Sequence, residues 1–68
     1  MRKQKVLETA QEIIEDGRKP SVEVISSELD FDPGSVHRCL NALEKEKEVE
    51  TYSKEVFGNK MRMVGVKR

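Results

Sequence analysis

Apolar residues recur three and four positions apart in three segments before residue 48, and this spacing places each set along one side of an α-helix. A helix with one apolar side must bury that side against another element, so this periodicity limits the fold strongly. The three stripes are Val6, Leu7, Ala10, Ile13 and Ile14; Val22, Ile25 and Leu29; and Val36, Leu40 and Leu43. We therefore expect amphipathic helices over residues 2–16, 21–29 and 33–47.

Residues with special backbone preferences mark the ends of these helices. Gly17 can take the left-handed conformation that ends the first helix, and Ser21 can cap the start of the second. Asp32 is suited to cap the third helix, with Pro33 as its first residue, where a missing N–H costs nothing. Residues 17–21 are therefore expected to form a loop.

The pattern changes at residue 49, after which Val, Thr, Tyr, Phe and Met are frequent. This composition predicts two antiparallel strands, at about 49–57 and 60–66, joined by a turn centred on Gly58 and Asn59. The expected cross-strand pairs are Phe57 with Lys60, Val56 with Met61 and Glu55 with Arg62. Met61, Met63, Val64 and Val66 are expected to fill the core, because a strand that faces three helices needs apolar side chains.

Length and composition exclude several classes of protein. A chain of 68 residues forms one domain and has little spare structure for an elaborate pocket. With one histidine and one cysteine it has no disulfide or zinc cluster of its own, and no set of catalytic residues can be assembled from it. We therefore expect neither an enzyme nor a cofactor nor a small-molecule substrate. No apolar run reaches the length of a membrane span or resembles a signal peptide, so a cytoplasmic location is expected.

The charges are unevenly distributed although they sum to zero, with 13 basic and 13 acidic residues. Residues 51–68 contain five Lys or Arg residues and a single acid, Glu55. A basic segment of this kind is typical of a surface that binds a polyanion. It is also compatible with a charged terminus that is simply solvated.

The side of residues 33–47 that lies opposite the apolar stripe is short, polar and basic. It contains Gly34, Arg38, Asn41 and Lys45. Arginine can contact guanine with two hydrogen bonds, asparagine can do the same with adenine, and lysine can meet a phosphate, so this face suits the major groove of DNA. A solvated polar face would have the same composition, and the helix alone does not decide between the two.

Three further residues of this helix invite a functional interpretation. Ser35 and the preceding glycine are small residues at the helix N-terminus, where backbone N–H groups favour a phosphate. His37, on the flank of the stripe, either contacts DNA or is solvated. Cys39, on the other flank, is interpreted as a small, half-buried apolar residue.

The order of elements and individual residues together resemble the winged helix-turn-helix domain of small prokaryotic and phage transcription regulators. The residues that carry the resemblance are Ile25, Ser26 and Leu29 before the turn, Ser35 and Val36 after it, and then Arg38, Leu40, Asn41, Leu43 and Val49. Two positions depart from the pattern, because Asp30 and Lys47 stand where the family usually has glycine. Aspartate tolerates left-handed geometry, whereas Lys47 indicates a helix that continues or that ends without a glycine cap.

The resemblance implies an α+β fold in which a three-helix bundle with a helix-turn-helix is followed by a C-terminal β-hairpin, the wing, in one domain over residues 1–68. It implies that residues 33–47 read the major groove of double-stranded DNA and that the wing contacts the backbone or the minor groove. The protein would then be a transcription regulator, located with the nucleoid when bound to DNA. The residues expected to contact DNA are Gly34, Ser35, His37, Arg38, Asn41, Lys45, Lys54, Lys60 and Arg62. Phe57, beside the turn, either packs back on the hairpin or contacts a sugar, a base step or a partner protein.

Two other functions are compatible with the same fold. Acidic residues surround the second helix and the turn after it, namely Glu23, Glu28, Asp30 and Asp32, and they would repel phosphates. They support a module that contacts another protein instead of DNA. A reader of Z-form nucleic acid is disfavoured, because Asn41 stands where that family has Tyr and the chain has no Trp. A homodimer is possible, since palindromic sites are read by dimers.

Overall fold

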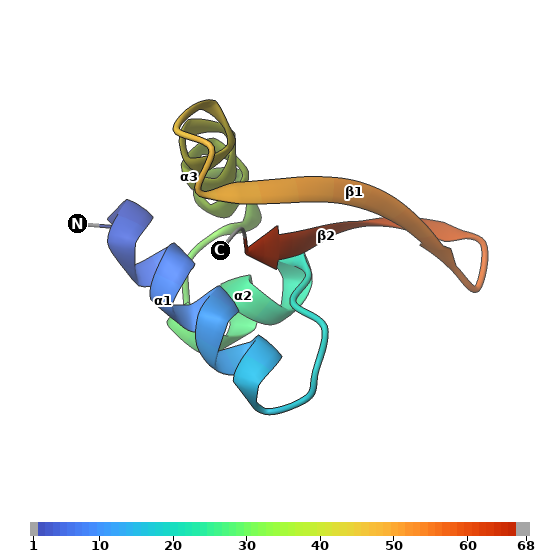
Figure 1. Cartoon of the computed structure of the whole chain (residues 1–68). Coiled ribbons are helices and arrows are strands. Elements are labelled where there is room, and N and C mark those ends of the chain that lie inside the picture. Colours follow the sequence, from blue (N-terminus) through green and yellow to red (C-terminus); the bar gives the residue numbers. More distant parts are fainter. Residues whose placement is uncertain (1, 67–68) are drawn as a thin grey trace.

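In the part of the chain that the structure describes, three helices are followed by a two-stranded antiparallel hairpin, so the fold is α+β (Figure 1). The computed structural model describes residues 2–66. The elements are α1 (Arg2–Glu15), α2 (Val22–Leu29), α3 (Pro33–Lys45), β1 (Val49–Val56) and β2 (Asn59–Val66). Each expected helix and strand is present, with ends that differ from the predicted ones by at most two residues.

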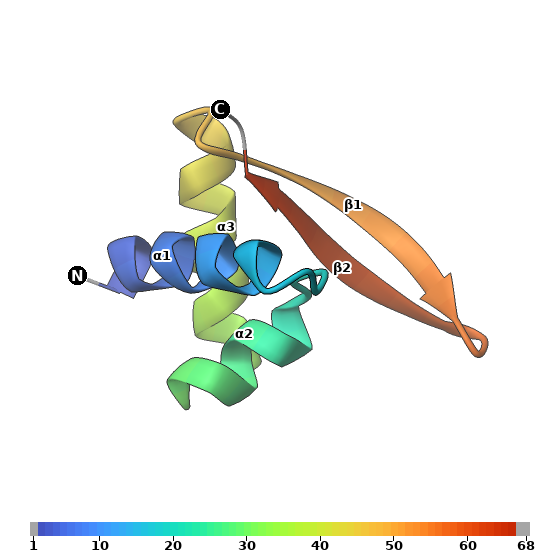
Figure 2. The same cartoon turned by 60° about the horizontal axis from the view of Figure 1, so that its bottom comes forward.

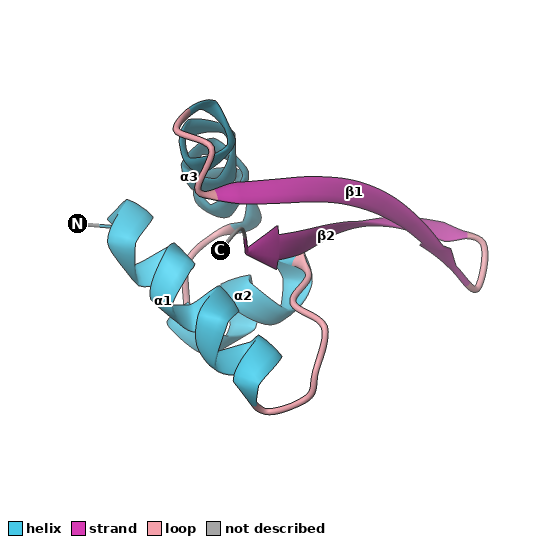
Figure 3. Ribbon diagram, in the orientation of Figure 1, coloured by secondary structure: helices cyan, strands magenta, loops and turns pink. Residues whose placement is uncertain are grey.

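The helices form a group from which the hairpin projects. α1 and α2 lie side by side, α3 crosses them steeply, and the near half of the hairpin packs against α3 while its turn lies far from every helix (Figures 2 and 3). β2 is also held from its other side, because Pro20 accepts a hydrogen bond of 2.9 Å from the N–H of Val64. The adjacent residues Ser21 and Met63 form an isolated antiparallel bridge. The loop between α1 and α2 therefore fixes where the hairpin leaves the helices.

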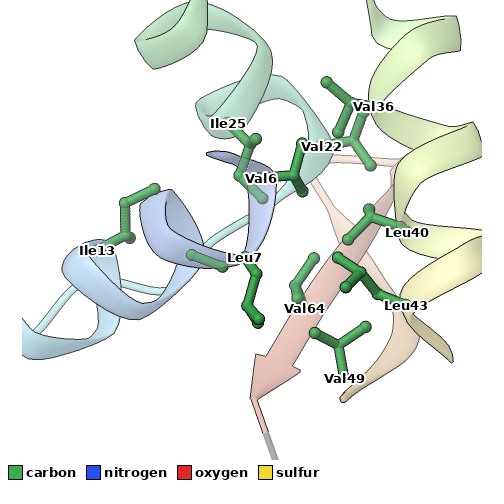
Figure 4. Close-up of a cluster of buried hydrophobic side chains, with 11 residues drawn as sticks. Val6, Leu7, Ile13, Val22, Ile25, Val36, Leu40, Leu43, Val49 and Val64 are labelled. Atoms are coloured by element: carbon green, nitrogen blue, oxygen red, sulfur yellow. The ribbon is translucent and has the colours of Figure 1, made fainter. Parts of the chain in front are cut away.

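All five elements contribute to one apolar core. Its buried members are Val6, Leu7, Ala10, Ile13, Val22, Ile25, Val36, Leu40, Leu43, Val49, Met63 and Val64. Figure 4 shows that Val22 and Ile25 of α2 approach Val6, while Val49 and Val64 of the hairpin meet the leucines of α3. Burying a side chain of this size stabilises a fold by about 1.5–3 kcal/mol, so these contacts supply most of the favourable free energy.

Several residues predicted for the core lie at its edge. Ile14, Leu29, Met61 and Val66 are only partly buried. They flank the fully buried stripes, where a chain this small has no further layer to cover them.

The predicted N-caps of α2 and α3 are confirmed. The hydroxyl of Ser21 accepts a hydrogen bond of 3.2 Å from the N–H of Val24, and the carboxylate of Asp32 accepts one of 3.0 Å from the N–H of Ser35. Pro33 is the first residue of α3. These contacts satisfy N–H groups that the helices leave unpaired at their starts.

α1 and α3 end in the same way although only α1 ends at a glycine. The N–H groups of Gly17 and of the next residue donate to the carbonyls of Ile14 and Ile13, which is the Schellman pattern. At the end of α3 the N–H of Lys47 donates to Glu44, and that of the next residue donates to Leu43. Lys47 therefore adopts the left-handed backbone, with φ of 62°, and α3 stops at residue 45 instead of continuing to 47.

The predicted register of the hairpin is wrong, because the turn lies one residue earlier in the chain than expected. Phe57 and Gly58, not Gly58 and Asn59, are the central pair, with φ of 51° and 79°. Positive φ at both positions is the signature of a type I′ turn, which matches the twist of the strands. Glu55 consequently faces Lys60, and Arg62 faces Ser53. Each residue keeps its face of the hairpin, because the partner changes by two positions.

We predict that Lys47→Gly stabilises the protein by about 1 kcal/mol, because glycine adopts the left-handed backbone without the steric cost that a lysine incurs. Chemical denaturation of the variant and wild type measures the difference. The matched control is Gly17→Lys, in the same motif at the end of α1, where the space around the added side chain is open. It should destabilise the protein by a similar amount, and equal stabilities of all three proteins would contradict the assignment.

Candidate nucleic-acid interface

The face of α3 opposite the core is exposed over its whole length. Val36, Leu40 and Leu43 are buried on the inner side. Five residues that the sequence predicted as DNA contacts lie exposed on the outer side: Gly34, His37, Arg38, Asn41 and Lys45. The arrangement presents a rod of polar and basic side chains to solvent.

Arg62 of β2 binds this outer face. Its guanidinium lies 3.0 Å from His37 Nδ1 and donates hydrogen bonds of 2.9 Å to Asn41 Oδ1 and 2.7 Å to Glu44 Oε1. The Thr51 hydroxyl of β1 donates to the other oxygen of the same glutamate at 2.9 Å. The hairpin is therefore attached to α3 by polar contacts as well as by the core, and the side chain of Arg62 is only 21% exposed.

These contacts determine what α3 can offer to a ligand. Arginine only donates hydrogen bonds, so in this contact Nδ1 of His37 serves as the acceptor. The carbonyl oxygen of Asn41 accepts from Arg62, which leaves its NH₂ group as a donor for another partner. The charge of Arg62 is offset by Glu44, so Arg62 orients its neighbours on α3 more than it adds positive charge.

The N-terminus of α3 differs from the expectation. Ser35 is only 4% exposed, and its hydroxyl donates a 2.7 Å hydrogen bond to Asp32 Oδ1. The capping carboxylate thus occupies the place that was predicted for a phosphate. Gly34 is exposed, and a β-carbon there would lie 3.1 Å from the same carboxylate, so a larger residue would press on the cap.

Two guanidinium groups converge next to this cap. Arg2 of α1 and Arg38 of α3 each donate to the hydroxyl oxygen of Ser35, at 3.4 and 3.3 Å. The Arg2 guanidinium also lies over the ring of Phe31, 5.4 Å from its centre. Sequence reasoning missed Arg2, because it belongs to no motif and only the packing of α1 on α3 brings it here.

The hairpin carries its basic residues on both faces. Lys54 and Lys60 are exposed, and the register places Lys60 on the same face as Arg62 and Lys54 on the opposite face. Among residues 2–66, neither lysine forms an ion pair, and neither does Lys45 of α3. Lys67 and Arg68, which add to the basic C-terminal segment, lie outside the described residues.

Phe57, in the turn, does not pack back on the hairpin. It is 100% exposed, so that alternative is wrong, and its contact with a ligand or partner stays a prediction.

The acidic residues near α2 are exposed as well. Glu23, Glu28, Asp30 and Asp32 all lie at the surface. Glu28 is 3.5 Å from Arg18, and the carboxylate of Asp32 is held by Ser35. Of the four acids, only Glu28 has a cationic partner among the described ion pairs, whereas the hydrogen bonds of Ser35 stabilise the charged form of Asp32.

Other kinds of site find no support in residues 2–66. They contain no group of three His, Cys, Asp or Glu residues that could hold a metal ion. None of their helices is long and apolar enough to span a bilayer. Cys39 is half-buried beside the core, as predicted. Comparison with known protein families, with curated proteins and with solved structures finds no match for this chain.

We predict that Arg62 and Glu44 are coupled by about 1 kcal/mol, because their charge-assisted contact is partly shielded from water. A double-mutant cycle with Arg62→Ala and Glu44→Ala, followed by urea denaturation, measures this coupling. The matched control is the cycle for Lys3 and Glu46, a more exposed ion pair, whose coupling should be smaller. Equal couplings would contradict a special role for Arg62 in joining the hairpin to α3.

We also predict that the cap of α3 makes the protein sensitive to acid. The Ser35 hydroxyl, and then its backbone N–H, lower the pKa of Asp32 below the ordinary value of 3.8. Because the folded pKa is depressed, the stabilisation is fully present above the unfolded value and is lost as the pH falls through the folded one. Thermal melts of wild type and Asp32→Asn, which caps without titrating, should differ by a constant amount above about pH 5 and converge at lower pH. A difference that stays constant to low pH would exclude this effect.

Proposed function

We propose that this chain is a winged helix-turn-helix domain that binds double-stranded DNA, with α3 in the major groove and the hairpin as the wing. The observation that carries the proposal is the outer face of α3, where Arg38, Asn41 and Lys45 are exposed while the inner face is fully buried. In this proposal the protein is a small transcription regulator.

The dimensions of α3 suit this role. It has 13 residues and is therefore about 20 Å long. The major groove is about 12 Å wide and admits one helix with its side chains. Small and polar residues at the exposed start of the helix, beginning with Gly34, allow its first turns to approach the base edges closely.

Two residues of α3 are proposed to read bases. Arg38 has one N–H group on the Ser35 hydroxyl, and its other donors are available for the O6 and N7 atoms of a guanine. Asn41 presents its NH₂ group, with its carbonyl oriented by Arg62, to the acceptors of a neighbouring base. Arg62 is proposed to act as a positioning residue for this amide.

Four other cations are proposed to hold phosphates. Lys45 continues the outer face of α3, Lys54 and Lys60 lie on the hairpin, and Arg2 adds a charge at the opposite end of α3. Contacts with phosphates fix the orientation of a protein on the duplex without reading its sequence.

The test of DNA binding is a fluorescence anisotropy titration of random duplexes at several salt concentrations. If four cations meet phosphates, the logarithm of the binding constant should fall with the logarithm of salt with a slope of about −3.6. Lys60→Ala should weaken binding to all sequences alike and reduce the slope by about 0.9. Lys19→Ala is the control with the same change of charge, since the α1–α2 loop lies far from α3 in Figure 1.

Base reading is tested separately. Arg38→Ala and Asn41→Ala should each reduce the discrimination between bases at one position of a selected duplex by about 1–3 kcal/mol, and they should leave other positions unchanged. Competition titrations with single-base variants of that duplex measure the effect. A uniform loss at all positions would show that these two residues meet only the backbone.

Absence of salt-dependent binding to any duplex, by a protein that circular dichroism shows to be folded, would overturn the proposal. The exposed acids around α2 would then favour contact with another protein, through the surface that includes Glu23 and Asp30.

A further inference from the structure

The turn of the hairpin contains a residue that the fold itself does not favour. Phe57 has a φ of 51°, a left-handed backbone that is rare for a bulky side chain. At this first central position of a type I′ turn, before Gly58, asparagine is the residue that favours the required conformation. Phe57 is also fully exposed, so its side chain does not stabilise the fold by packing. Neither turn geometry nor the core accounts for an aromatic ring at this place.

The turn lies beyond the hairpin's contact with α3 by a distance comparable to the spacing of grooves in DNA. Arg62 of β2 hydrogen-bonds to Asn41 and Glu44 of α3, and the turn lies farther along the hairpin. The register places Arg62 opposite Ser53, four positions before Phe57, so at about 3.4 Å per residue the strand carries the turn about 14 Å beyond that contact, and the exposed side chain of Phe57 adds to this reach. One turn of B-DNA is about 34 Å, so neighbouring major and minor grooves are about 17 Å apart. With α3 in the major groove, the hairpin is long enough to bring Phe57 to the adjacent minor groove.

Two lysines flank the ring symmetrically. Lys54 and Lys60 are each three residues from Phe57, one on each strand, and the register places them on opposite faces of the hairpin. A minor groove is bordered by two phosphate backbones about 6 Å apart. A hairpin that enters it end-on would place one lysine beside each backbone and the ring between them.

We propose that Phe57 is an apolar wedge that enters the minor groove and partly unstacks one base step, so that the bound duplex is kinked. This proposal rests on the proposed function and adds a class of target to it. Apolar side chains inserted from the minor groove bend DNA toward the major groove. Pyrimidine–purine steps unstack most easily, so the favoured duplexes contain such a step about five base pairs from the centre of the α3 contact.

The test compares Phe57→Asn and Phe57→Leu with wild type on a short duplex that wild type selects from a random pool. Asparagine fits the turn and removes the wedge, whereas leucine keeps an apolar wedge and the strained backbone. Energy transfer between dyes on the two duplex ends reports bending, and 2-aminopurine at the expected step reports unstacking. Melting temperatures show whether each variant is folded.

Wild type and Phe57→Leu should bend the duplex and increase 2-aminopurine fluorescence. Phe57→Asn should leave the duplex straight and the 2-aminopurine stacked, and should bind roughly tenfold more weakly, although its melting temperature rises. The proposal is overturned if Phe57→Asn bends the duplex as wild type does, or if the wild-type complex is straight. In both cases salt-dependent binding persists and the proposed function stands, whereas a wild type that binds no duplex removes both proposals. Phe57 would then be assigned to a protein contact.

Discussion

The architecture depends on burying one apolar stripe from each of three short helices together with three residues of the hairpin, Val49, Met63 and Val64. With 68 residues there is material for only one such core, and Val6, Ile25 and Leu40 within it are completely buried. A core this small covers one side of each helix and no more. The outer face of α3 is therefore exposed as a direct consequence of the size of the chain. Exposure alone does not indicate a binding surface, and it is the polar and basic composition of this face that supports one.

The hairpin would be loosely placed if the core alone held it, because only its near half carries buried residues. Two polar attachments restrict it further. On one side the carbonyl of Pro20 binds β2, and on the other Arg62 binds α3. The second attachment also belongs to the charge pairing around α3. Glu44 and Glu46 are engaged by Arg62 and Lys3, so acids close to α3 are neutralised by residues of other elements, while the exposed lysines remain unpaired among the described residues.

Sequence reasoning succeeded where the cause of the structure is local. Helical periodicity and the caps at Ser21 and Asp32 depend on residues within four positions of each other, and they were predicted closely. It failed where distant residues decide. The register of the hairpin was ambiguous because Gly58 can belong to either of two turns, and the sequence does not show which of them the packed strands adopt. The burial of Ser35 and the arrival of Arg2 beside it also require the packing of α1 against α3, which periodicity does not specify.

The residues other than glycine with positive φ are Asp30, Lys47 and Phe57, and each lies in a connection between two elements. The interactions that hold their backbone in this conformation differ. Asp30 tolerates it, and its N–H bonds back to α2. Lys47 does not, but it lies in the short connection between the buried residues Leu43 and Val49, whose packing restrains the chain on both sides of it. Phe57 has no such surroundings, because its side chain is fully exposed and it lies just beyond the last pair of the strand ladder. A residue that conflicts with its local backbone and receives no packing in return is better explained by what it contacts outside the molecule than by the fold, and in this chain Phe57 is the clearest example.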